Sequence, residues 1–254
     1  GYWVSRFETS FLKAKPPRVI TFGLVPGSHL AGKYEVVSRL GSGWEGEVYL
    51  VREIGTRIDR TVKIFFPRRN PGNRALRFYA RKLHKLRHCP VVIQYHTRDT
   101  FDFNGMPVSF LVSEFVEGEL LSDFLKRQSG RRVNPFQGVH LLHALALGIE
   151  AIHNVGEYHG DLHTDNVIVL RHGLGFDLKL LDMFSWGAPN AENIQHDVFD
   201  LIRIFYDALG GPRWYSRQPQ EVKDICKGLK RSLIAREFRS AGQLCQHLET
   251  MEWQ

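Results

Sequence analysis

The strongest constraint on the fold is a glycine-rich segment, Gly-Ser-Gly-Trp-Glu-Gly at positions 41–46, which lies between two strand patterns. Residues 34–40 and 47–51 have the composition of strands, so the segment is predicted to form the turn of a hairpin. A strand rather than a helix follows the third glycine, which argues against a dinucleotide-binding fold and favours a loop whose backbone covers nucleotide phosphates. Glycine-rich turns without any ligand are also common, so both interpretations stay open on this motif alone.

Composition bounds the class of protein. The chain has 254 residues, 43% of them hydrophobic and 24% charged, which is ordinary for one large globular domain or two small lobes. We find neither a run of about 18 apolar residues nor a signal-peptide pattern, and therefore expect a soluble protein. Cys89, Cys226 and Cys245 are odd in number and far apart, which argues against a disulfide framework or a zinc site. A reducing, cytoplasmic compartment is expected.

The net charge of +7 comes from one segment. Residues 67–98 hold nine Lys and Arg and no acid, which leaves 25 basic against 27 acidic residues elsewhere. Within this segment a helix is predicted over 70–87, with Tyr79 on its apolar face. The basic side chains between Arg74 and Arg87 then form either a solvated surface or a docking face for an acidic, phosphate-bearing or nucleic-acid partner.

A lysine lies inside an apolar strand pattern. Residues 60–66 predict a strand that contains Lys63. An ammonium group in a buried strand is costly unless an anion meets it, so Lys63 requires a phosphate or a carboxylate partner. The alternative is an edge strand on which the lysine reaches solvent.

A polar loop at residues 158–165 leads directly into a hydrophobic strand predicted over 166–170. Asp161 and Asn166 lie five residues apart in this segment and could present a base and a metal ligand to one substrate. Alone, the two residues are ordinary loop formers. A largely buried helix is predicted over 140–153 before the loop, and a return strand over 178–181 ends in Asp182.

Taken together, these motifs resemble the eukaryotic-like Ser/Thr protein kinase family. The matching segments are 41–48, Val62-Lys63, the apolar-to-acidic stretch 111–118, His159-Gly160-Asp161 with Asn166, and Leu180-Leu181-Asp182. The resemblance covers roughly residues 33–250 and implies an α+β, bilobal protein-kinase-like fold. The small β-rich N-lobe would span 33–118 and the mainly helical C-lobe 119–254, after an extension at 1–32 to which we assign no role.

The resemblance implies ATP and Mg²⁺ as cofactors and assigns roles to single residues. Asp161 would accept the proton of the attacking hydroxyl, with His163 beside it, while Asn166 and Asp182 would hold Mg²⁺. Lys63 would hold the α- and β-phosphates under the glycine-rich loop. Ser113 would be the gatekeeper residue. The nucleotide-binding set is Gly41, Ser42, Gly43, Gly46, Val48, Lys63, Glu114, Val116 and Glu119.

Two departures concern charged residues of the family. The helix glutamate that pairs with the strand lysine is Tyr79 here, so Lys63 needs another counter-charge, for which Asp182, Glu45, Glu47 or the nucleotide are candidates. The arginine of the H-R-D motif is Gly160. Control through activation-loop phosphorylation is therefore not expected.

The segment after Asp182 departs as well. The D-F-G triplet of the family is Asp182-Met183-Phe184 here. Only fourteen residues separate Asp182 from Asp197. The family's A-P-E triplet is absent from this segment, and Gly187-Ala188-Pro189 resembles it only weakly. His163 gives the loop a similarity to aminoglycoside and choline phosphotransferases.

Three functions therefore remain open. The first is a kinase that phosphorylates Ser or Thr of itself or of a partner protein. The others are a kinase for a small-molecule hydroxyl and a catalytically weak, pseudokinase-like binding module. Beyond the loop, helices are predicted over 197–209, 219–233 and 240–251, the last with Ser240 as its N-cap.

Overall fold

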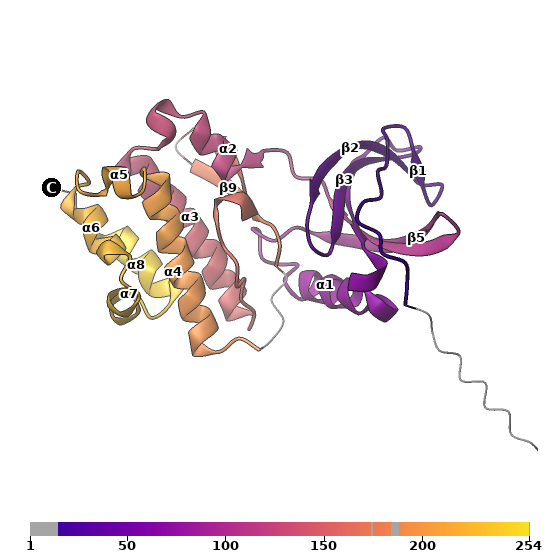
Figure 1. Cartoon of the computed structure of the whole chain (residues 1–254). Helices are drawn as coiled ribbons and strands as arrows, with labels where there is room; N and C mark the ends of the chain where they lie inside the picture. Colours follow the sequence, from indigo (N-terminus) through magenta and orange to yellow (C-terminus); the bar gives the residue numbers. More distant parts are fainter. Residues whose placement is uncertain (1–14, 174, 184–187, 254) are drawn as a thin grey trace, which may run out of the picture. The chain divides into compact units, whose positions relative to one another are not determined.

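The computed structural model describes residues 15–173, 175–183 and 188–253. Their contacts divide the chain into two compact units (Figure 1). Residues 15–77 and 97–112 form the first, which we call the strand unit, and residues 78–96 and 113–253 form the second, the helical unit. The expected α+β class, with strands mainly first and helices mainly last, is confirmed.

The strand unit is built on a six-stranded sheet. Its hairpin of β2 (Tyr34–Ser42) and β3 (Gly46–Glu53) carries the glycine-rich turn, as predicted, and pairs Ser42 with Glu47. β4 (Asp59–Phe65) pairs with β3 antiparallel and places Lys63 opposite Val48. In spatial order the strands are β1 (His29–Leu30), β2, β3, β4, β6 (Met106–Glu114) and β5 (Tyr95–Phe103).

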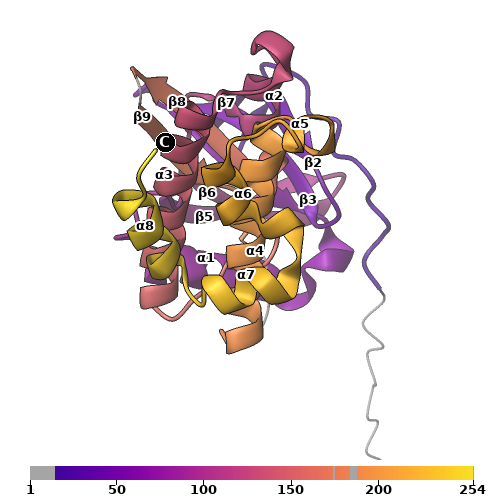
Figure 2. The same ribbon diagram turned by 90° about the vertical axis from the view of Figure 1, so that its left-hand side faces the viewer.

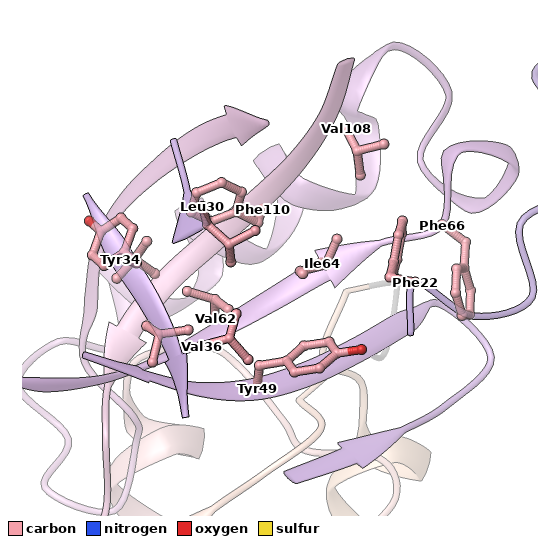
Figure 3. Close-up of a cluster of buried hydrophobic side chains, with 12 residues drawn as sticks. Phe22, Leu30, Tyr34, Val36, Tyr49, Val62, Ile64, Phe66, Val108 and Phe110 are labelled. Atoms are coloured by element: carbon pink, nitrogen blue, oxygen red, sulfur yellow. The ribbon is translucent and has the colours of Figure 1, made fainter. Parts of the chain in front are cut away.

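The core of the strand unit includes a residue from the region before the first predicted strand. Phe22 is buried and lies beside Phe66 (Figure 3). The two rings are stacked, with their centroids 5.4 Å apart. The Phe22 ring also packs edge-on against Phe101 and Phe103. Phe22 and Leu30 therefore belong to this core, although most of the residues between 15 and 29 are exposed. The other buried members include Tyr34, Val36, Tyr49, Val62, Ile64, Val108 and Phe110.

The helical unit is organised around two long helices. α3 (Pro135–Asn154) begins with a capping box between Asn134 and Gln137 and packs against α4 (Ala191–Ala208) and α8 (Ala241–Thr250), which Figure 2 shows beside it. Ser240 caps α8 as predicted. The remaining elements are α2 (Leu121–Lys126), α5 (Pro212–Tyr215), α6 (Gln220–Cys226), α7 (Arg231–Glu237) and a small sheet of β7 (Glu119–Leu120), β8 (Val167–His172) and β9 (Gly175–Leu180).

The basic helix is shorter than predicted. Two 3₁₀ turns, Pro67–Arg69 and Pro71–Asn73, precede it. α1 spans Arg74–Lys85 and begins only after Gly72 and Asn73, because these two residues of the second turn take positive φ values of 57° and 60°. Tyr79 faces inward as expected and is 7% exposed.

Two other predicted elements are wrong. The apolar run 91–95 predicts a strand, but residues 91–94 form only a single bridge, from Val92 to Leu180. The strand β5 begins at Tyr95 and pairs with β6 in a hairpin that turns at Asn104-Gly105. The helix predicted over 219–233 is split into α6 and α7, since residues 227–229 all take positive φ.

The three cysteines are free and buried. Burial raises the pKa of the Cys226 and Cys245 thiols to about 12. Among the described residues, none of the helices combines the length and apolarity that a membrane crossing requires.

Candidate active site

The glycine-rich turn needs its glycines for different reasons. A Cβ atom on Gly46 would lie 2.0 Å from the backbone oxygen of Ile64, so the fold itself requires glycine there. A Cβ atom on Gly41 or Gly43 would meet nothing within 4 Å, and neither residue has a positive φ. The strand unit therefore gives no packing reason for these two glycines. A ligand that approaches the backbone closely would supply one.

Lys63 meets a carboxylate of the same turn. Its Nζ lies 3.2 Å from Oε2 of Glu45, and both side chains are only 14% exposed. Glu47, the neighbouring candidate, has a different role. It is fully buried and accepts hydrogen bonds from the Tyr49 hydroxyl at 2.6 Å and from the backbone N–H of Phe22 at 3.1 Å. Glu45 is thus the turn acid that is placed to neutralise Lys63.

In the helical unit, a buried carboxylate fixes the polar loop. Asp197 on α4 is completely buried, and its two oxygens each lie 2.8 Å from a backbone nitrogen, Oδ2 from that of His159 and Oδ1 from that of Gly160. The His153 ring on α3 lies 2.9 Å from the same carboxylate. Hydrogen bonds to a charged acceptor are among the stronger ones in proteins. The backbone just before Asp161 is therefore held firmly.

His159 is a neutral structural link. Burial lowers its pKa, and the Leu181 carbonyl, which accepts from Nε2 at 2.7 Å, only partly opposes this shift. Nδ1 accepts the backbone N–H of Asp161 at 3.1 Å. This pattern requires the proton on Nε2, so His159 joins the backbone of Asp161 to that of the residue before Asp182.

The loop brings three of the predicted side chains together. The Asp161 carboxylate is 72% exposed and lies 3.7 Å from Nε2 of His163. Asn166 is 3% exposed, and its Nδ2 donates to the Asp161 carbonyl at 2.6 Å and lies 2.9 Å from His163 Nε2. With the amide nitrogen used in this way, Oδ1 is the atom that Asn166 can offer to a cation.

Asp182 follows β9 and is linked to Asn166 through the backbone. The N–H of Leu181 donates to the Asn166 carbonyl at 2.8 Å. Asp182 itself has a φ of 57°, a left-handed conformation that is uncommon for residues other than glycine and is often found at functional sites. Phe184, the third residue of the predicted triplet, lies outside the described residues, as does Gly187.

The donor set suits a magnesium ion that is only partly held by protein. Asn166 and Asp182 offer oxygen ligands, and no cluster of three or more His, Cys, Asp or Glu side chains suited to a metal occurs in the described part of the chain. Mg²⁺ commonly takes one or two protein oxygens and completes its shell with phosphates and water. The residues therefore fit Mg²⁺ bound together with a nucleotide.

The predicted adenine-side residues lie at the end of β6 and just after it. Ser113 is buried, and the Glu114 side chain accepts from the backbone N–H of Gln94 at 3.0 Å and from Lys179 Nζ at 2.8 Å. Glu119 is bound in a bidentate ion pair by Arg127, which lowers the pKa of that carboxyl. A ribose contact by Glu119 would have to share this carboxylate with Arg127.

Sequence reasoning missed two features next to the loop. Lys82 on α1 is buried rather than part of the exposed basic face, which holds Arg74, Arg77 and Arg81. A cavity of about 600 Å³ adjoins the loop at Gly160. It is lined mainly by side chains of α4 and α7, among them His196, Phe199, Arg231 and Ile234. Neither feature has a local sequence signal, because each depends on which elements pack together.

Comparison with known proteins places these features in a family. Residues 34–215 match the protein kinase domain. The Ser/Thr-protein kinase pkn2 of Myxococcus xanthus is 34% identical over 190 residues, which are 74% of this chain and 21% of pkn2. The Ser/Thr-protein kinase PrkC of Bacillus subtilis is 23% identical over 185 residues, which are 71% of this chain and 27% of PrkC. The chain thus spans only a fifth to about a quarter of these relatives.

The fold agrees with a solved structure. The crystal structure of the Mycobacterium tuberculosis PknI kinase domain (C20A_R136N double mutant) matches with a TM-score of 0.66 and 20% sequence identity, covering 89% of this chain and 98% of that one. The chain therefore belongs to the protein kinase domain family, with the sheet-based and helical parts of the kinase fold, and is homologous to bacterial Ser/Thr kinases.

Proposed function

We propose that the chain transfers the γ-phosphoryl group of ATP to a Ser or Thr hydroxyl of its own chain or of a partner protein. A bond forms between the hydroxyl oxygen and the γ-phosphorus while the bond from that phosphorus to the ADP oxygen breaks. Asp161 accepts the hydroxyl proton, Lys63 binds the α- and β-phosphates, and Asn166 and Asp182 hold Mg²⁺. Catalysis is then mainly a matter of positioning and charge neutralisation.

One observation carries the proposal. The carboxylate of Asp161 is 72% exposed, whereas the backbone on both sides of it is fixed by buried partners, Asp197 before it and Asn166 after it. An exposed carboxylate on a rigid backbone is what a base that meets an external hydroxyl requires. A loop carboxylate without a catalytic role would need no such support.

A second candidate is a binding module with weak catalysis. It is favoured by Tyr79, which stands in α1 where the family has the glutamate partner of the strand lysine. The pair of Lys63 with Glu45 argues against this alternative, because Glu45 gives the ammonium of Lys63 a counter-charge until phosphates bind. In either case the exposed Arg74, Arg77 and Arg81 offer a docking face for an acidic or phosphate-bearing partner.

The experiment that tests the proposal follows the labelled γ-phosphate. The purified chain is incubated with labelled ATP and Mg²⁺, alone, with a general protein acceptor, and with small alcohols such as an aminoglycoside. We expect label on Ser or Thr of protein, lost in both Asp161→Asn and Asp182→Asn. Transfer only to the small alcohol would favour the small-molecule kinase, and nucleotide binding without transfer would favour the binding module.

A further inference from the structure

Lys82 is an unusual lysine because its side chain points into the protein. It is 4% exposed, and its Nζ lies 5.5 Å from the centre of the Tyr158 ring and 6.0 Å from that of Phe78. Burial lowers the pKa of this ammonium, although Glu157 and Asp197 raise it. A buried charge lowers stability unless it gains a strong interaction. An apolar residue would therefore usually be favoured at this position.

The interaction that Lys82 gains is with the segment leading into the catalytic loop. Its Nζ donates to the backbone oxygen of Tyr158 at 3.1 Å. Three residues later on α1, Lys85 lies 3.0 Å from Glu157 Oε1 and 3.4 Å from the Gly156 carbonyl. Two lysines of α1 thus hold residues 156–158.

The Tyr158 carbonyl belongs to the same peptide group as the His159 N–H. Lys82 binds the oxygen of this group, and Asp197 binds its N–H at 2.8 Å. In a trans peptide the C=O and N–H point in opposite directions. One peptide plane is therefore held at its two ends by groups of opposite charge, an ammonium from α1 and a carboxylate from α4.

The residue after this peptide plane explains why the plane has to be fixed. Gly160 follows directly, has a φ of 92° and carries no side chain that could anchor the loop. Glycine is the most permissive residue for changes of backbone conformation. Without external contacts, the peptide before Gly160 could turn and would carry Asp161 with it.

We propose that Lys82 is a positioning residue that, with Asp197, locks the peptide plane between Tyr158 and His159 and so orients Asp161. This inference rests on the proposed role of Asp161 as the base. It adds a residue of α1 to the groups that orient Asp161. Helix α1 then sets the geometry of the catalytic loop through a lysine rather than through an acid, and Lys85 serves only as an outer support.

The test compares Lys82→Met, which keeps the length and loses the charge, with Lys85→Met at the more exposed position. For Lys82→Met we expect kcat to fall at least about tenfold while KM for ATP stays unchanged. Thermal stability should change little, because removing the cost of the buried charge offsets the loss of the hydrogen bond to the Tyr158 carbonyl. Lys85→Met should keep kcat within about twofold. A purely structural role would instead lower stability together with activity, and this result would overturn the proposal.

Amide hydrogen exchange makes the test independent of activity. In Lys82→Met the amides of His159 and Gly160 should exchange at least about tenfold faster, with exchange in α8 unchanged. Unchanged exchange at residues 159–160 would overturn the lock, and faster exchange with unchanged kcat would overturn the positioning role. If the unmodified chain transfers no phosphate, the proposed function fails, while exchange still decides whether the lock exists.

Discussion

Nζ of Lys63 lies 3.2 Å from the carboxylate of Glu45, so the lysine of β4 is paired with an acid of the glycine-rich turn itself. If Lys63 binds nucleotide phosphates, the phosphates compete with the Glu45 carboxylate for the Lys63 ammonium. Glu45 belongs to the same turn that would cover the phosphates. We expect Glu45→Gln to lower the Kd for ATP about fivefold, because about 1 kcal/mol of repulsion between like charges is removed. Isothermal titration calorimetry measures this change.

The matched control for Glu45 is Glu53→Gln. It breaks an ion pair of 2.6 Å with Arg60 in the same sheet but away from the turn, and should leave the Kd for ATP unchanged. Weaker ATP binding by Glu45→Gln would contradict the expectation and would mean that Glu45 aligns Lys63 for the phosphates.

Alanine substitutions at Gly41 and Gly46 should separate the effect on ATP binding from the effect on stability. Gly41→Ala should leave the melting temperature unchanged, since the added Cβ meets nothing, but should weaken ATP binding about tenfold by keeping phosphates from the backbone. Gly46→Ala should destabilise the fold by about 2–3 kcal/mol, because its Cβ would overlap the Ile64 carbonyl. Thermal unfolding and ATP titration of both variants check this. Full ATP affinity in Gly41→Ala would remove the ligand-based reason for glycine at this position.

Stability should depend on pH through His159. Its folded-state pKa lies below the value of about 6.5 expected in the unfolded chain, so the unfolded state binds the proton more readily. The free energy of unfolding should therefore be highest above about pH 6.5 and should fall as the pH is lowered through this value toward the depressed folded-state pKa. Urea unfolding at several pH values should show this slope, reduced in His159→Gln and unchanged in the exposed control His88→Gln. Equal slopes in all three proteins would exclude this role of His159.

The segment before β1 should be essential for folding of the strand unit. Phe22→Ala removes a buried ring stacked on Phe66 and should cost about 3–4 kcal/mol of unfolding free energy. Phe136→Ala, at a ring that is 49% exposed, should cost less than about 1 kcal/mol. Chemical unfolding of the two variants measures the difference. Similar small losses would show that the segment is only loosely attached.

The sequence predicted those parts of the fold that have a clear local pattern. The glycine hairpin, β4 and the two long helices follow from hydrophobic patterns and from the glycine-rich turn, and the start of α8 follows from its N-cap Ser240. The strand Tyr95–Phe103 was missed because its residues before Phe101 are mostly polar and exposed, so that apolar alternation is confined to its last residues. The sequence signals for this hairpin are the apolar strand β6 and the Asn104-Gly105 turn.

Prediction of the candidate site from the sequence was limited in the same way. Asp161, Asn166 and Asp182 were proposed as site residues because the loop and the strands beside it resemble a family. Lys82 was counted with the basic residues of its segment, since a sequence cannot show that this ammonium meets the Tyr158 carbonyl. Phe22 lacked any periodic neighbours, and its burial depends on aromatic residues of β5 that are distant in sequence. Long-range packing decides both positions.

The most direct test of the central claim is the rate of phosphate transfer from labelled ATP to protein Ser or Thr in Asp161→Asn, compared with the unchanged chain. Loss of the base should lower this rate about 10²–10⁴-fold, while the Kd for ATP and the melting temperature stay the same. A transfer rate in Asp161→Asn equal to that of the unchanged chain would contradict the account, because the exposed carboxylate on its fixed backbone would then have no part in the reaction.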